Sequence, residues 1–366
     1  MTIDIVIARE TAAGERRAAV TPETCKKLVA QGARVRIERD VGRGAHFPDQ
    51  AYADAGADIL ERIDGALTEA DIVLCVQPPP AAVIASLRAG AALVGTLQPQ
   101  ADAARGEAIT ARGIVAFPLE RLPRTTRAQA MDVLSSQAGM AGYKAVLIGA
   151  QLVPRFFPML TTAAGTIRPS KVLIVGAGVA GLQAVATAKR LGAQVECFDV
   201  RPETREQIES LGGKFLDLGV SAAGEGGYAR QLTDAERAEQ QQRLGEHLKG
   251  IDVIVCTAAV PGRPAPKIIS AAMVAGMKPG SVIVDLAAET GGNCELTRPG
   301  ETYDTDAGIT IAGPRDLASS GALHASEMYA RNVYNFVSLL ITDGALAFDW
   351  NDELLAKTVW PERVVV

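Results

Sequence analysis

Histidine, cysteine and aromatic residues are scarce in this chain of 366 residues, and basic side chains do not outnumber acidic ones. None of the three histidines, His46, His247 and His324, pairs with a Cys, Ser or carboxylate at a catalytic or metal-binding spacing, which disfavours hydrolysis and metal chemistry. The five cysteines are scattered and form no CxxC pair, so we expect a reducing cytosol without disulfides or structural zinc. With 37 Lys and Arg against 42 Asp and Glu, the chain has no basic surplus for nucleic acid.

Long hydrophobic runs are also missing. The longest, such as Ala145–Ala150 and Phe336–Ile341, fall far short of the roughly 20 residues that cross a bilayer. The sequence therefore predicts no direct membrane insertion. An apolar fraction of 48% over this length predicts a well-cored globular protein with two domains.

Short β-branched runs alternate with helical segments along the chain, which is typical of a parallel, doubly wound sheet. We predict an α/β fold of two Rossmann-like doubly wound domains, joined by long helices and with a cleft between them. The first domain would comprise residues 1–133 plus 318–366, and the second residues 134–317. The two long helices are expected at Arg127–Gln151 and Ser319–Ile341. The expected strands are Thr2–Ala8, Arg34–Glu38, Asp71–Val76, Ala91–Leu97, a run after Ser170, Gln194–Val200, Ile251–Thr257 and Ser281–Leu286.

The strongest motif is GxGxxG, formed by Gly176, Gly178 and Gly181 between an expected strand and an expected helix. Such glycines allow a tight turn and a close approach of backbone N–H groups to a pyrophosphate at the helix N-terminus. Asp199 ends the next strand, 18 residues after Gly181, where a carboxylate accepts hydrogen bonds from ribose and repels a 2′-phosphate. The pattern favours NAD(H) over NADP(H), with Arg201 stacking on adenine or pairing with carboxylates. The alternative is a structural turn with an incidental acid.

Two further segments are candidates for ligand contact. Gln129, Asp132 and either Ser135 or Ser136 recur at three- to four-residue spacing, so we expect them on one face of the first long helix. That polar stripe suits either ligand contact or helix capping. The glycine-rich segment 224–230 carries Tyr228, and it suits either a loop that closes over a cleft or an idle surface loop.

Several segments together resemble the alanine dehydrogenase and pyridine nucleotide transhydrogenase family. The resemblance covers nearly the whole chain and is carried by Glu15–Glu23, Gly42–Ala45, Arg155–Ile167, the glycine turn with Phe198–Pro202, Thr257–Gly262, Val284–Ala288 and Gly291–Cys294. Within the family, the chain is most similar to the NAD(H)-binding soluble component of proton-translocating NAD(P) transhydrogenases, which is the first portion of their alpha subunit. Its segment Arg124–Ser136 resembles the signature of that component.

That resemblance implies a role for each matching residue. Arg124, Asp132 and Ser135 would position the nicotinamide and its ribose, Gln129 would reach toward the nucleotide of a partner, and Tyr228 would lie in a mobile loop. The cofactor-binding residues implied are Gly176, Gly178, Val179, Ala180, Gly181, Asp199, Arg201, Thr257, Ala258, Asp285 and Leu286.

The chain departs from the alanine dehydrogenases where those enzymes carry a Lys and a His that bind and protonate the keto acid. Gln77 and Gln98 stand there instead, and glutamine cannot shuttle a proton at neutral pH. Arg17, which would pair with a substrate carboxylate in the dehydrogenases, is present, and Glu289 stands where they carry an Asp. Reduction of C=O or C=N needs a proton as well as a hydride, whereas transfer between two nicotinamides needs only the hydride.

We therefore expect a Re/Si-specific, proton-translocating transhydrogenase component. It would bind NAD(H) and exchange hydride with NADP(H) on a separate component, while membrane-spanning partners translocate protons. The resemblance also implies a homodimer held on the cytoplasmic face of the plasma membrane through its partners. Two alternatives remain, an alanine-type amino-acid dehydrogenase and a non-catalytic NAD(H) sensor.

Overall fold

The computed structural model describes residues 2–99, 101–219, 233–259 and 263–362. The chain divides into two compact units: unit 1 comprises Met1–Gln137 and Ala318–Val366, and unit 2 comprises Ala138–Leu317. Each unit contains a largely parallel sheet with helices on both faces. The predicted α/β class with Rossmann-like, doubly wound sheets is confirmed.

The sheet of unit 1 has six parallel strands in the order β3-β2-β1-β4-β5-β6. The strands are β1 (Asp4–Ile7), β2 (Arg34–Glu38), β3 (Asp58–Leu60), β4 (Ile72–Leu74), β5 (Ala92–Gly95) and β6 (Val115–Pro118). Strand order reverses beside β1, so the ends of β1 and β4 form the switch point of this sheet. The sequence did not predict β3 and β6, which are short and carry little alternation.

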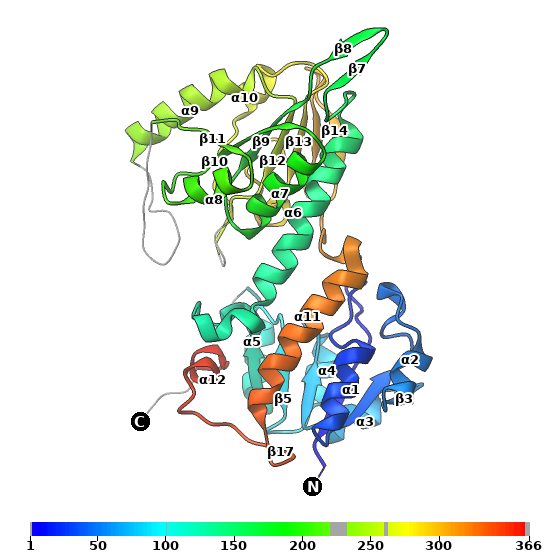
Figure 1. Cartoon of the computed structure of the whole chain (residues 1–366). Helices are drawn as coiled ribbons and strands as arrows, with labels where there is room; N and C mark the ends of the chain where they lie inside the picture. The colour runs from blue at the N-terminus through cyan, green and yellow to red at the C-terminus, as the bar shows by residue number, and fades with distance from the viewer. Residues whose placement is uncertain (1, 100, 220–232, 260–262, 363–366) are drawn as a thin grey trace. The chain divides into compact units, whose positions relative to one another are not determined.

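Both faces of this sheet are covered because successive apolar side chains point to opposite sides. Ile5 and Ile7 face one core and Val6 faces the other. The first core is completed by α1 (Pro22–Ala30), α2 (Asp49–Asp54), α11 (Ala322–Val337) and α12 (Glu353–Thr358), and the second by α3 (Asp64–Glu69), α4 (Ala81–Ser86) and α5 (Ala103–Arg112). In Figure 1 the orange and red C-terminal helices accordingly lie among the blue and cyan elements of unit 1.

The sheet of unit 2 has the order β11-β10-β9-β12-β13-β15-β14, and β14 is antiparallel to its neighbour. The strands are β9 (Lys171–Val175), β10 (Gln194–Phe198), β11 (Lys214–Phe215), β12 (Val253–Cys256), β13 (Val282–Asp285), β14 (Thr302–Asp304) and β15 (Thr310–Ala312). Here the order reverses beside β9, so the carboxyl ends of β9 and β12 form the switch point where doubly wound sheets bind ligands.

Helices cover both faces of this second sheet as well. One face packs against α6 (Val133–Leu152), α7 (Val179–Arg190) and α8 (Thr204–Ser210), and the other against α9 (Asp234–Leu248) and α10 (Ala271–Ala275). All four residues Val172–Val175 of β9 are at most 1% exposed, as expected for a central strand that is covered on both sides.

Two hairpins belong to neither of these sheets. One pairs β7 (Leu160–Thr162) with β8 (Gly165–Ile167), and the other pairs β16 (Ile341–Thr342) with β17 (Ala345–Leu346). Around the first, Phe156, Met159 and Ile167 are exposed. Over the portion of the chain that the structure describes, no helix is both long and apolar enough to cross a membrane.

The first predicted long helix is wrong at its start. Residues Thr126–Met131 form a 3-10 helix, and α6 begins only at Val133. Asp132 interrupts the two because its carboxylate accepts the backbone N–H of Ser135 at 2.9 Å and the Ser135 hydroxyl at 2.6 Å. Asp132 therefore acts as a helix N-cap, and Gln129 does not share a helix face with Asp132 and Ser135.

Candidate functional site

The glycine turn of unit 2 lies at the switch point, directly after β9. Gly176 has a φ of +100°, and a Cβ on it would lie 2.8 Å from Thr257 Oγ1. A Cβ on Gly181 would lie 1.8 Å from the carbonyl oxygen of Gly176. Both positions therefore require glycine: Gly176 because the turn packs directly against the loop that follows β12, and Gly181 because the helix starts directly over the backbone of the turn.

The N-terminus of α7 continues this turn. Gly178 is the N-cap and makes no side-chain hydrogen bond to the helix, so the first N–H groups, including those of Val179 and Ala180, are not capped by it. Val179 is 46% exposed. An uncapped N-terminus at the switch point of a doubly wound sheet is suited to binding a phosphate group.

Asp199 follows β10 and is buried beside the turn. Its carboxylate accepts the Ala177 N–H at 2.7 Å and the Arg201 N–H at 2.9 Å. It also accepts Nε of Arg201 at 2.9 Å and a terminal guanidinium nitrogen at 2.8 Å. Burial alone would raise the pKa of Asp199, but Arg201 and the Ala177 N–H hold that pKa below its ordinary value. The two side chains thus form an ion pair, which is one of the two roles expected for Arg201.

The loop after β12 closes the other side of the switch point. The Thr257 hydroxyl lies 2.9 Å from the carbonyl oxygen of Gly176 and 3.1 Å from that of Val175 and can donate to either. Both polar backbone groups of Ala258 are bound by the side chain of Asn293, to which the sequence assigned no role.

Asp285 and Leu286 lie at the end of β13. Asp285 is fully buried, and its carboxylate accepts the N–H groups of Ala287 and Cys294 at 3.0 Å and the Thr297 hydroxyl at 2.6 Å. The N–H of Leu286 donates to the carbonyl oxygen of Cys256 at 3.0 Å. Asp285 thus fixes the neighbouring backbone, and a role for either residue in lining the cofactor path stays a prediction.

Four predicted residues belong to unit 1: Arg124, Gln129, Asp132 and Ser135. Arg124 and Gln129 are exposed, whereas Asp132 and Ser135 are partly buried and bonded to each other. Their roles toward nicotinamide stay predictions, and Tyr228 lies outside the described residues. Among those residues no group of three or more His, Cys, Asp or Glu could hold a metal ion.

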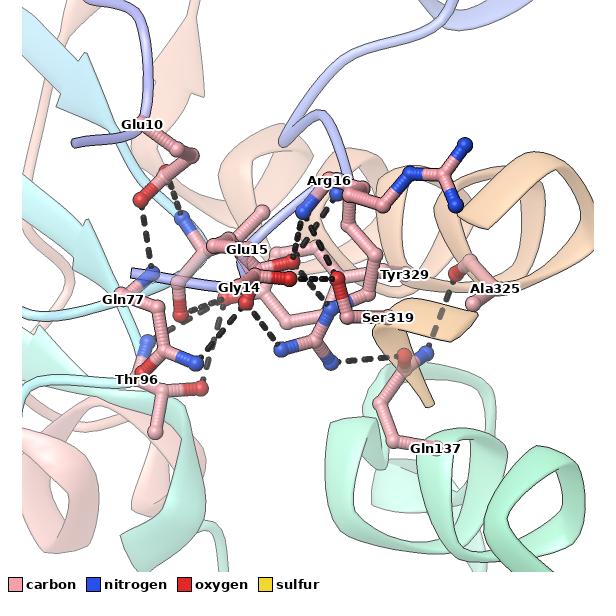
Figure 2. A network of polar contacts seen from close by, with 12 residues as sticks. Glu10, Gly14, Glu15, Arg16, Gln77, Thr96, Gln137, Ser319, Ala325 and Tyr329 are labelled. Carbon is pink, nitrogen blue, oxygen red and sulfur yellow. Dashed lines mark hydrogen bonds and ion pairs between the residues drawn. The ribbon is translucent and has the colours of Figure 1, made fainter. Parts of the chain in front are cut away.

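A polar network that the sequence did not predict lies at the carboxyl ends of the strands of unit 1 (Figure 2). At its centre is the buried ion pair of Arg17 and Glu15, with side chains 9% and 1% exposed. The Arg17 guanidinium donates to both Glu15 oxygens, at 2.8 and 2.5 Å, and to the side-chain oxygen of Gln137 at 2.9 Å. The Gln77 amide donates to Glu15 at 2.8 Å. Arg17, the residue that would pair with a substrate carboxylate in an alanine dehydrogenase, therefore binds a carboxylate of its own chain here.

Glu10 ties this network to the end of β4. Its carboxylate accepts the N–H groups of Val76 and Gln77 at 2.5 and 3.2 Å. Burial raises the pKa of Glu10 to about 7, although these two N–H groups act to lower it. Glu10, Glu15 and Arg17 also line an open pocket of about 370 Å³, together with Arg9, Arg16, Asp40, Val41, Arg43 and Gly44.

Comparisons with known proteins agree with this architecture. Residues 6–141 match the family described as Alanine dehydrogenase/PNT, N-terminal domain, and residues 145–363 match Alanine dehydrogenase/PNT, C-terminal domain. The chain belongs to this family. Both domains characteristic of the family are therefore present, which confirms the resemblance carried by the sequence motifs.

Relatives from both branches of the family are similar to this chain. The first portion of NAD(P) transhydrogenase subunit alpha from Rhodospirillum rubrum is 45% identical over 343 residues, covering 91% of this chain and 89% of that protein. A crystal structure of transhydrogenase from Sinorhizobium meliloti has a TM-score of 0.88 and 40% identity, covering 98% of both chains. Alanine dehydrogenase of Mycobacterium tuberculosis is 30% identical over 301 residues, covering 81% of this chain and 76% of that enzyme. Identity is thus higher to the transhydrogenases.

Proposed function

We propose that this chain is the NAD(H)-binding component of a proton-translocating transhydrogenase. It binds NAD(H) in unit 2 and transfers hydride directly between NADH and NADP⁺ held on a partner component. Separate membrane subunits couple the transfer to proton translocation. The complex lies at the cytoplasmic face of the plasma membrane, and this chain is attached through its partners.

The observation that carries this proposal is the Arg17 network. A keto-acid reductase needs a free cation for the substrate carboxylate and a group that supplies a proton. Here Arg17 is bound by Glu15, and glutamines stand at positions 77 and 98 in place of the Lys and His of the dehydrogenases. Hydride transfer between two nicotinamides requires neither group, only close apposition and exclusion of water.

The nucleotide specificity follows from the turn and from Asp199. The N-terminus of α7, which has no side-chain cap, supports pyrophosphate binding. We infer that the Asp199 carboxylate accepts ribose hydroxyls in exchange for its present bonds to Arg201. Bound NADH would supply the hydride, and the residues of unit 2 would hold its adenosine and pyrophosphate in place. We expect NADH to bind much more tightly than NADPH. Equal affinities in parallel titrations would contradict the ribose assignment.

Mixing experiments test the transfer itself. The purified chain is combined with a purified NADP(H)-binding transhydrogenase component, and reduction of an NAD analogue by NADPH is followed by absorbance. We expect turnover that requires both components. If no competent component supports turnover while NADH still binds, the sensor alternative gains support.

The alanine-type dehydrogenase is the second candidate, favoured by the 30% identity to an enzyme of that name. It predicts NAD⁺ reduction by the chain alone in the presence of L-alanine. We expect none, because Glu15 occupies Arg17 and because glutamines stand at positions 77 and 98 in place of the Lys and His of the dehydrogenases. Alanine oxidation by the purified chain would overturn the proposed function.

We also propose that the chain forms a homodimer. The β7–β8 hairpin pairs only within itself among the described residues, and the exposed apolar side chains of Met159 and Ile167 on and beside it support a protein contact there. Light scattering should therefore give twice the mass of one chain. A monomer at micromolar concentration would contradict the dimer.

A further inference from the structure

Asn293 is fully buried in unit 2, where it faces the loop that follows β12. Its side-chain oxygen accepts the N–H of Ala258 at 3.0 Å, and its side-chain nitrogen donates to the carbonyl oxygen of Ala258 at 2.7 Å. The same nitrogen donates to the carbonyl oxygen of Pro266 at 2.9 Å. One amide thus satisfies both backbone groups of a single residue, as a neighbouring strand would do.

The backbone of Ala258, which Asn293 binds, packs against the glycine turn. A Cβ on Gly176 would lie 3.1 Å from the Ala258 nitrogen and 2.8 Å from Thr257 Oγ1. The position of Ala258 therefore sets the space left beside the turn. Without the amide, two polar groups of the Ala258 backbone lose their partners, and the loop can move away from the turn.

Asn293 is itself fixed from the end of the next strand. The Asp285 carboxylate accepts the N–H of Cys294 at 3.0 Å, and the backbone carbonyl of Asn293 accepts the N–H groups of Ile268 and Ile269 at 2.8 and 3.0 Å. The ends of β13, β12 and β9 are thus linked in series through Asp285, Asn293 and Ala258.

We propose that Asn293 is a positioning residue for the pyridine-nucleotide site, holding the Thr257–Ala258 loop against the glycine turn so that the turn keeps the shape that binds pyrophosphate. This inference rests on the proposed NAD(H) binding. Asn293 acts through Ala258 and Gly176 and needs no contact of its own with the nucleotide.

Two substitutions separate the contributions of the amide. Asn293→Ala removes all three hydrogen bonds. Asn293→Asp keeps the shape and the acceptor for the Ala258 N–H but loses both donated bonds, and it brings a negative charge toward two carbonyl oxygens. We expect either change to weaken NADH binding by roughly 5- to 100-fold, because a buried partner is left unsatisfied.

Ser281→Ala is the matched control. Ser281 is also buried in unit 2, and its hydroxyl donates to the carbonyl oxygen of Ile251 at 3.0 Å. This bond lies at the amino end of β13, at the opposite edge of the same sheet from the glycine turn. The control should lower the melting temperature, because the buried carbonyl oxygen of Ile251 loses its hydroxyl donor, and it should leave the NADH affinity unchanged.

The test measures NADH affinity of the full chain by fluorescence titration and melting temperature by circular dichroism, together with hydrogen exchange of the peptide that contains Ala258. We expect faster exchange there in both Asn293 variants and not in Ser281→Ala. If the Asn293 variants bind NADH as tightly as the control, the positioning role is overturned. If the unmodified chain fails to bind NADH, the proposed function fails, and hydrogen exchange still reports whether Asn293 restrains the loop.

Discussion

Removal of the Glu15 carboxylate is the most direct perturbation of the Arg17 network. In the native chain this carboxylate accepts two bonds from the Arg17 guanidinium, one from the Gln77 amide, and the backbone N–H groups of Arg16 and Arg17 at 3.1 and 2.9 Å. Glu15→Ala leaves the guanidinium buried and bound only by Gln137 among these side chains. Burial opposes the charge of Glu15, yet Arg17 keeps the pKa of Glu15 below its ordinary value.

The expected cost follows from the burial of both partners, whose side chains are 9% and 1% exposed. Breaking such a pair by removing one partner lowers the free energy of unfolding by about 3–5 kcal/mol. In a unit of this size that corresponds to a fall in melting temperature of roughly 6–20 °C. A matched control is Glu61→Ala, which breaks an ion pair to Arg39 with side chains 70% and 56% exposed. The control should cost no more than about 1 kcal/mol.

Formate or acetate should restore the lost stability of Glu15→Ala, because a small carboxylate can take the place of the deleted one on Arg17. At a concentration one hundred times its dissociation constant, such a ligand returns about 2.7 kcal/mol. Thermal denaturation with sodium formate is compared with sodium chloride at equal ionic strength, so that general screening is subtracted. If Glu15→Ala melts at the same temperature as the native chain, or if formate and chloride have equal effects on it, the view that Glu15 occupies Arg17 is refuted.

Three further outcomes are expected. Gly181→Ala should abolish NADH binding in a fluorescence titration, because the added Cβ would lie 1.8 Å from a backbone oxygen. The control Gly139→Ala, which has open space around the added Cβ, should bind NADH normally. Retained NADH affinity in Gly181→Ala would contradict the tight turn. Arg201→Ala should raise the preference for NADH over NADPH several-fold, because the uncompensated Asp199 charge repels a 2′-phosphate; equal losses for both nucleotides would count against this. The pKa of Glu10 is raised to about 7 in the folded state, so this group makes the protein less stable as the pH rises from about 4.5 to 7. Glu10→Gln should therefore make the melting temperature less dependent on pH over that range. A pH profile like that of the native chain would argue against a buried Glu10 carboxyl.

The sequence was most informative where local pattern and tertiary structure agree. The strand, glycine turn and helix around Gly176 were predicted because a buried parallel strand and a phosphate-binding turn each restrict the residues allowed. The start of α6 was not predicted correctly, because the stretch around it is rich in helix-forming residues. Nothing in that stretch indicates that the Asp132 side chain caps a new helix, with Thr126–Met131 before it as a 3-10 helix.

The hydrogen-bond partners in the candidate site could not be predicted from the spacing of residues along the sequence. Glu15 and Gln137 meet on Arg17 although more than 100 residues separate them along the chain, and Asn293 reaches Ala258 from a different loop. Such contacts depend on which strand ends are adjacent, so they appear only once strand order is known. The motif Gly291–Cys294 identified the segment of Asn293 as characteristic of the family without indicating its partner.

The core of unit 1 has a consequence for the order of folding during synthesis. The core cluster that contains Ile5 and Ile37 also contains Tyr329 and Phe336 of α11 and Leu354 and Leu355 of α12. This core therefore lacks some of its packing until α11 and α12 have left the ribosome. Unit 2, by contrast, is one uninterrupted stretch that is synthesised earlier. We therefore expect unit 2 to fold first. Unit 1 cannot complete its core until α11 and α12 have been synthesised, and in that interval it is the unit exposed to chaperones and proteases.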